Sequence, residues 1–154
     1  MSVAQFAALQ TGVKRSFVTE KEVKAAALPE PASALAIFGG GDGIERLPQV
    51  EWLRKRAVMY GVDIDTHGFA MMDRPHANLP RVRSLLMDAA LLEVHRHVGE
   101  REDADRRHLV KLARLAKSEQ KVFPALRDDR YDASLRLELE RVGYGWTVEA
   151  IGAA

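Results

Sequence analysis

Four short apolar runs alternate with helix-forming stretches over the first part of the chain. A run that is apolar throughout, rather than at every second residue, is typical of a strand buried on both faces. Strands of this kind separated by helices form parallel sheets with right-handed crossovers. The sequence therefore predicts an α/β domain with a four-stranded parallel sheet flanked by helices. The four expected strands are residues 17–19, 34–38, 57–60 and 82–87.

Between these runs the composition favours helices. One helix is expected to begin at Glu20 and to end before Pro29, which cannot continue a helix. Two others are expected over residues 47–54 and 68–79. Asp88 follows the fourth strand and is a residue type that caps helix N-termini, so a further helix should begin there.

After Asp88 the pattern predicts a helical C-terminal tail that packs over the sheet. Leu109, Leu112 and Leu115 recur on one face of an expected helix, and Ser118 should cap the next one. Residues 100–107 are densely charged and are expected to form a solvated connection. We interpret residues 14–154 as one domain and residues 1–13 as an N-terminal extension.

Composition limits the possible chemistry. The chain has 154 residues, 47% of them hydrophobic and 29% charged, which fits one folded, soluble unit. The formal net charge of +1 gives no overall attraction for a polyanion, although it does not exclude a local basic patch. The absence of cysteine excludes disulfides, thiolate metal sites and cysteine nucleophiles, and favours a cytoplasmic location. No run approaches the roughly 20 apolar residues of a membrane-spanning helix, so no membrane partner is expected.

Two acids directly after the third expected strand carry the most information about function. Ligands of open α/β sheets bind at the carboxyl ends of the strands, where Asp63 and Asp65 should lie. In an extended segment both carboxylates point to one side and Ile64 points into the core. Paired carboxylates suit Mg²⁺, which prefers oxygen ligands. The alternative is that Asp63 only ends the strand and Asp65 only caps the next helix.

Two other segments lie at the same edge of the expected sheet. Glu20 ends the first strand and could join the two aspartates at a metal, or could simply favour the N-terminus of the following helix. Residues 39–43, Gly-Gly-Gly-Asp-Gly, could bring backbone amides to a phosphate, or could form a tight turn. They match neither a P-loop nor a dinucleotide fingerprint.

Five stretches together carry a family pattern: residues 17–23, 36–41, 60–69, 83–88 and the Arg-Leu-Glu-Leu-Glu-Arg run at 136–141. They resemble the C-terminal domain of JetD, the nuclease subunit of Wadjet plasmid-defence systems, a Toprim fold similar to that of the topoisomerase VI A subunit. The resemblance spans about residues 17–151. It implies that Glu20, Asp63 and Asp65 bind Mg²⁺, or Mn²⁺, in a DNA endonuclease. It also implies plasmid DNA and SMC-like Wadjet subunits as partners; a homodimer is a further possibility.

Four more residues match the family motif: Glu22, His67, Glu138 and Glu140. His67 could contact the scissile phosphate or orient water, or could be an ordinary surface residue. Glu138 and Glu140 are two residues apart in an expected helix, so at most one of them should reach the metal. Glu22, Glu138 and Glu140 are candidate additional metal ligands.

The sequence departs from the family at two places. Gly61-Val62 stands where a Trp-Gly pair is usual, and Leu139 where an amide is usual. Neither change removes an expected metal ligand. The family's N-terminal half has no counterpart here, which suggests a fragment or a shortened homologue.

The expected reaction is hydrolysis rather than attack by tyrosine. Tyr60 lies in an apolar strand, and Tyr131 and Tyr144 fall in the expected helical tail, none beside an evident base. Two alternatives remain open: a non-catalytic Toprim interaction module of an SMC-like complex, and a Toprim nuclease that processes RNA.

Overall fold

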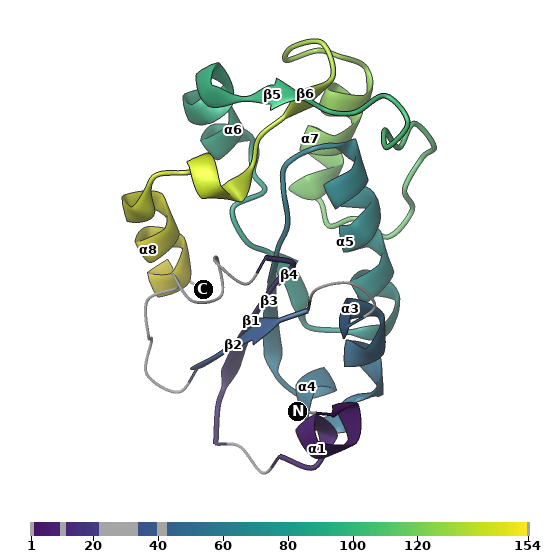
Figure 1. The fold of residues 1–154 in the computed structure, drawn as a ribbon, viewed down its shortest axis with the longest axis vertical. Helices are drawn as coiled ribbons and strands as arrows, with labels where there is room; N and C mark the ends of the chain where they lie inside the picture. The colour runs from purple at the N-terminus through teal and green to yellow at the C-terminus, as the bar shows by residue number, and fades with distance from the viewer. Residues whose placement is uncertain (1, 10–11, 22–33, 40–42, 154) are drawn as a thin grey trace.

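A parallel sheet of four strands lies at the centre of the computed structural model, which describes residues 2–9, 12–21, 34–39 and 43–153. The strands lie in the order β2-β1-β3-β4 (Figure 1). This confirms the predicted four-stranded parallel sheet and the α/β, Toprim-like fold class. The strands are β1 (Arg15–Thr19), β2 (Ala34–Phe38), β3 (Ala57–Gly61) and β4 (Val82–Ser84).

The two central strands are buried because side chains on both of their faces are apolar. Phe17 and Val18 of β1 and Val58 and Tyr60 of β3 are at most 1% exposed. Burying one large apolar side chain stabilises the folded state by about 1.5–3 kcal/mol. The sheet core is therefore built around β1 and β3, the two strands that lead to the candidate site.

Helices cover both faces of the sheet. Figure 1 shows α5 (Thr66–Asn78) on one side and α8 (Tyr144–Ala153) on the other. On the α5 side lies α7 (Glu119–Arg127), where Phe123 meets the ring of Phe69 at 6.0 Å. A part-buried hydrogen bond also joins these two helices, with His76 Nε2 at 2.8 Å from Glu119 Oε2.

Shorter elements complete the two layers. Near the start of the chain, the Phe6 ring of α1 (Val3–Ala7) packs at 5.2 Å from Trp52 of α4 (Glu51–Arg54). The other elements are α3 (Gly43–Arg46), η1 (Leu47–Gln49), α6 (Ala89–His95), η2 (Arg96–Val98), β5 (Glu100–Arg101), β6 (Leu135–Arg136) and η3 (Leu139–Arg141).

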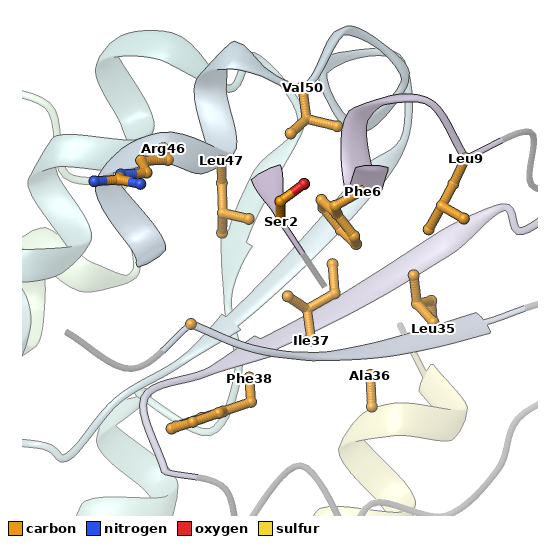
Figure 2. A pocket seen from close by; sticks show the side chains of 11 residues that line it. Ser2, Phe6, Leu9, Leu35, Ala36, Ile37, Phe38, Arg46, Leu47 and Val50 are labelled. Carbon is orange, nitrogen blue, oxygen red and sulfur yellow. The ribbon is translucent and has the colours of Figure 1, made fainter. Parts of the chain in front are cut away.

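An apolar pocket of about 320 Å³ lies between α1 and the edge strand β2 (Figure 2). Leu35 and Ile37 of β2 point into it, beside Phe6 and Leu47, whereas Ala36 and Phe38 point to the opposite face of the sheet. Among the described residues, its lining contains no acidic side chain and shares no residue with the small pocket of the carboxylates discussed below.

The prediction of a helical tail after Asp88 is confirmed for α6, α7 and α8, but it is wrong for segments between them. Strands β5 and β6 pair antiparallel, and residues 102–118 contain no helix. Leu109 is 58% exposed instead of sharing a buried face with Leu115. The reason is that backbone N–H groups of this segment donate hydrogen bonds to side chains of other elements instead of to carbonyl groups within a helix. His108 donates to Thr66 Oγ1, Arg114 to Asp73 Oδ1 and Ala116 to Glu119 Oε2, at 2.7–2.8 Å.

Two smaller predictions also need correction. The fourth strand ends at Ser84 rather than at residue 87, because Leu86 adopts a left-handed backbone conformation with φ of 60°. Ser118 lies at the N-cap of α7, but its side chain makes no capping bond. Asp88 does cap α6 as predicted, since its Oδ1 accepts from Leu91 N at 2.9 Å.

The helix predicted from Glu20 falls on residues outside those that the structure describes, apart from its first two. Among the helices within the described ranges, none is long and apolar enough to cross a membrane.

Candidate functional site

The ends of β1 and β3 bring the predicted acids to one edge of the sheet. The two strands are in register, with Thr19 beside Gly61, so the residues that follow each strand leave the sheet together. Glu20 and Lys21 follow β1, and Asp63 follows β3 by two residues. Together with Glu140 they line a small pocket of about 10 Å³, close to the space that one water molecule or ion occupies.

Asp63 is bound by three donors. Its Oδ1 accepts from Leu139 N at 3.1 Å, and its Oδ2 lies 3.0 Å from Arg136 Nη2 and 3.2 Å from Lys21 Nζ. The residue at which the family usually has an amide, Leu139, thus contacts Asp63 through its backbone. Two of the three donors are full cations, so Asp63 lies in a cluster of alternating charge.

Asp65 lies on the same side of the chain as Asp63, as the alternation predicts. Ile64 between them is fully buried and pairs with Leu137, with Ile64 N to Leu137 O at 2.9 Å. The Arg136 guanidinium bridges the two acids, since its Nε lies 3.5 Å from Asp65 Oδ2. Asp65 also caps α5, its Oδ1 accepting from Gly68 N at 2.6 Å. The capping interpretation is therefore correct, and it does not exclude a second role.

Asp65 is buried in an unfavourable electrostatic environment. Burial, followed by the negative charges of Glu102 and Asp63, raises the pKa of its carboxyl from 3.8 to about 7. The hydrogen bond from Gly68 and the charge of Arg136 offset part of this effect. Near neutral pH, Asp65 is therefore poised between its charged and neutral forms.

Glu20 is half-buried at the end of β1. Burial and then the charge of Asp63 raise the pKa of its carboxyl, which is the effect expected when carboxylates gather without a sufficient positive charge. Arg106, Lys21 and Arg136 partly offset it.

The expectation that Glu138 and Glu140 lie in one helix is wrong, whereas the expectation that at most one of them reaches a metal stays a prediction. Glu138 is extended, with ψ of 134°, and η3 begins only at Leu139. Both carboxylates consequently approach Lys21 Nζ, at 3.8 Å for Glu138 Oε1 and 3.0 Å for Glu140 Oε2. Both residues thus belong to the same cluster as Asp63.

The two cations at the centre of the cluster were not assigned a role from the sequence. Arg136 contacts Asp63, Asp65 and Glu138, the last at 3.1 Å through Nη2. Burial alone would lower the pKa of Lys21, but hydrogen bonds to Glu140 and Asp63 outweigh it and raise that pKa. Their positions in the sequence are the signal that could have identified them, because Lys21 directly follows Glu20 and Arg136 begins the Arg-Leu-Glu run.

Glu102 is a further residue that the sequence did not identify. Residues 100–107 were expected to be solvated, yet Glu102 is only 5% exposed. Its carboxylate accepts from Thr66 N at 3.2 Å, from Thr66 Oγ1 at 2.8 Å and from His67 N at 2.9 Å. It therefore occupies the N-terminus of α5 together with Asp65, where negative charge is favourable.

His67 lies half-buried in the first turn of α5, next to this N-terminus. Burial and then the positive charge of Arg106 lower the pKa of its imidazole, so the ring is mainly neutral at pH 7. Glu22 lies outside the described residues, as do residues 40–42 of the glycine-rich segment, so their predicted roles stay predictions.

The donor set fits a hard divalent cation in kind, because the converging groups offer carboxylate oxygens. In the part of the chain that the structure describes, no three Asp, Glu or His side chains surround a common metal position. Side-chain cations lie among the acids instead, with Lys21 Nζ within 3.8 Å of Asp63, Glu138 and Glu140. The ammonium group thus marks a point at which a positive charge is stabilised. The predicted metal ligands Glu20, Asp63 and Asp65 stay a prediction.

Tyr60 is inaccessible, and neither Tyr131 nor Tyr144 is among the described residues that line the small acidic pocket. Tyr60 is 1% exposed, and burial raises the pKa of its hydroxyl well above the usual range. Tyr144 is the first residue of α8 and is 63% exposed, and Tyr131 lies in a bend after α7 rather than in a helix.

Comparison with known proteins supports the resemblance seen in the sequence. No curated protein matches the chain. The family model described as "Wadjet protein JetD, C-terminal" matches residues 1–151. That match includes residues 1–13, and it extends over the acid cluster, Glu102 and most of α8. The chain belongs to the family of the C-terminal domain of the Wadjet protein JetD.

Proposed function

We propose that the chain is a metal-dependent endonuclease domain that hydrolyses phosphodiester bonds of double-stranded DNA, with Glu20, Asp63 and Asp65 as the metal ligands. One observation carries the proposal: acids from two adjacent parallel strands meet at the carboxyl edge of the sheet, where side-chain cations lie among them. Ligand sites of open α/β sheets occupy that edge. Magnesium fits the oxygen donors, and manganese accepts the same ligand type.

A metal ion held by these acids would bind a nonbridging phosphate oxygen, lower the pKa of an attacking water and stabilise the leaving oxygen. The side chains of the domain contribute by holding that arrangement in place. Arg136 keeps Asp63 and Asp65 side by side, since it contacts both carboxylates. Glu102 fixes the start of α5 and thereby the position of Asp65.

His67 is the candidate for orienting water or contacting the scissile phosphate. Because its lowered pKa leaves the imidazole neutral at pH 7, a ring nitrogen can accept a proton from water. The unfavourable environment of Tyr60, with a strongly raised pKa, makes attack by its hydroxyl ineffective. Hydrolysis by water is therefore the proposed chemistry, with no covalent protein–DNA intermediate.

Family membership supports a role in plasmid defence, with other Wadjet subunits as partners. We propose plasmid DNA as the substrate and the SMC-like subunits as the partners that deliver it. The net charge of +1 agrees with delivery of DNA by partner subunits, because a domain with so little charge attracts DNA only weakly by itself.

A nicking assay on supercoiled plasmid tests the proposal. With Mg²⁺ or Mn²⁺ we expect nicked and linear products, and with EDTA none. Asp63→Asn should lower the rate by about a thousandfold, because charge stabilisation at the cleaved bond depends on the metal site. Glu51→Gln is the matched control, since Glu51 is exposed and its ion pair is with Lys55, away from the acid cluster. Cleavage by Asp63→Asn at the wild-type rate would refute the assignment.

The alternative of a non-catalytic interaction module also has support. The acids of the cluster are already paired with Lys21 and Arg136, and Asp65 caps a helix, so a purely structural role is self-consistent. Calorimetry with Mn²⁺ separates the two functions, because the module needs no metal. The same nicking assay with structured RNA in place of plasmid tests the RNA-processing alternative.

A further inference from the structure

The ammonium group of Lys21 lies among three carboxylates contributed by two distant parts of the chain. Asp63 follows β3, whereas Glu138 and Glu140 lie some 75 residues later around η3; their oxygens are 3.2, 3.8 and 3.0 Å from Lys21 Nζ. Glu20, next to Lys21, lines the small pocket together with Asp63 and Glu140. Lys21 is therefore a cation on which Asp63, Glu138 and Glu140 converge.

Lys21 and a divalent cation at Asp63 would compete for the same oxygens. Asp63 Oδ1 already accepts from Leu139 N, and Oδ2 faces Lys21 and Arg136. Two cations held a few ångströms apart repel each other strongly where solvent screening is reduced. An ion that binds Asp63 therefore requires one of these side chains to withdraw.

Lys21 is the side chain that can leave. It is 40% exposed, and its four-carbon stem can place the ammonium in water at little cost. Arg136 is 21% exposed and is held by Asp63, Asp65 and Glu138 together. Its planar guanidinium also bridges the two aspartates, a contact that would remain useful while a metal is bound.

We infer that Lys21 is the built-in counter-ion of the acid cluster and that a divalent cation binds by displacing its ammonium group. The inference rests on the proposed metal-dependent function and adds a residue that sets the affinity for the metal. Lys21 stabilises the metal-free domain and, by the same contacts, weakens metal binding. Binding of the metal also releases the Lys21 ammonium beside the edge where the phosphate of the substrate would lie.

Titration calorimetry of the whole chain with Mn²⁺ tests this. Lys21→Gln should bind Mn²⁺ about tenfold more tightly than the wild type, because one competing charge is removed from a partly exposed cluster. Lys55→Gln is the control for the change in net charge. Lys55 is exposed, pairs with Glu51, and lies at the opposite end of β3. Its affinity should stay within about twofold of the wild type, since charges beyond the screening length interact weakly.

Thermal unfolding gives a second readout that does not depend on activity. In EDTA, Lys21→Gln should unfold at a lower temperature than the wild type, because its acids lose their counter-ion. With saturating Mn²⁺ the difference should disappear, because the contacts that stabilise the metal-free wild type are the ones that the metal displaces, so tighter binding by the variant offsets its loss. A purely structural salt bridge would lower the unfolding temperature under both conditions.

The outcomes separate the two ideas. Equal or weaker Mn²⁺ affinity of Lys21→Gln, with the wild type binding Mn²⁺, overturns the inference and leaves the proposed function intact. Absence of Mn²⁺ binding in both proteins overturns both. Binding by Lys21→Gln alone supports both, since it shows that the lysine holds the metal site closed.

Discussion

Replacing Asp65 by Asn should stabilise the metal-free domain at alkaline pH. Burial, with the neighbouring charges of Glu102 and Asp63, raises the pKa of Asp65 from 3.8 to about 7. A raised pKa means that the folded state favours the protonated carboxyl. The stability cost of ionising Asp65 is therefore absent below about pH 4, grows as the pH rises, and is complete above about pH 7.

The size of the effect follows from this shift. A shift of about three pKa units corresponds to about 4 kcal/mol at pH 8, and to only about 1 kcal/mol at pH 4.5. Asn keeps the capping oxygen for Gly68 N, because Asn and Asp cap helices about equally well. The Asp65→Asn variant loses its ion pair with Arg136 Nε, but Arg136 keeps Asp63 and Glu138. We therefore expect a net gain of roughly 2–4 kcal/mol at pH 8.

Urea unfolding in EDTA at pH 8 and pH 4.5 measures this gain. Asp88→Asn is the matched control, because Asp88 caps α6 through Leu91 N but is exposed. It should show no gain at pH 8. The reasoning would be refuted if Asp65→Asn were less stable than the wild type at pH 8, or if its advantage were the same at both pH values.

Three further changes have definite expected outcomes. Gly68→Ala should destabilise the domain by about 2–4 kcal/mol in urea unfolding, because its Cβ would lie 2.1 Å from the carbonyl oxygen of Asp63. Glu102→Ala should cost about 3 kcal/mol in the same assay, because it leaves the buried donors of Thr66 without their acceptor. Tyr60→Phe should keep stability within about 1 kcal/mol, because the buried hydroxyl has no hydrogen-bond partner among the described residues. Plasmid nicking by this variant should continue, and denaturation during cleavage should trap no protein on the DNA.

The central sheet could be predicted because its strands carry their own signal. Strand β2 has the predicted bounds, and β1 and β3 differ from prediction by two residues or fewer. The fourth strand was predicted too long, because residues 85–87 are buried and apolar without being extended. An apolar run shows that a segment is buried, but not which backbone conformation it adopts there.

The segment from residue 102 to 118 could not be predicted from local pattern. Its backbone donors bind side chains such as Thr66 and Asp73, some 40 residues earlier in the chain. Glu102 shows the same limit, because a carboxylate in a charged run is usually exposed. The burial of Glu102 is favourable because the backbone N–H groups at the start of α5 donate to its carboxylate.

The positions of the acids at the site could be predicted because they follow from the predicted strands. Strand alternation placed Asp63 and Asp65 on one side, and the parallel register brought Glu20 to the same edge. The contacts of Lys21 with Glu140, 119 residues away, have no periodic signature. Glu138 and Glu140 were misplaced because their helix-friendly composition is overridden by the pairing of Leu137 with Ile64.

The charge of Asp65 is the feature that folding alone does not account for. An Asn would cap α5 as well, and would avoid a buried negative charge beside Glu102 and Asp63. Glu20 has the same disadvantage, since burial and Asp63 raise its pKa as well. Acids that weaken the metal-free fold are expected where a bound cation repays the cost, because active sites concentrate such perturbed groups. The same physical reason therefore underlies the predictions at Asp65 and at Lys21: the site has an excess of negative charge, and a cation is needed to offset it.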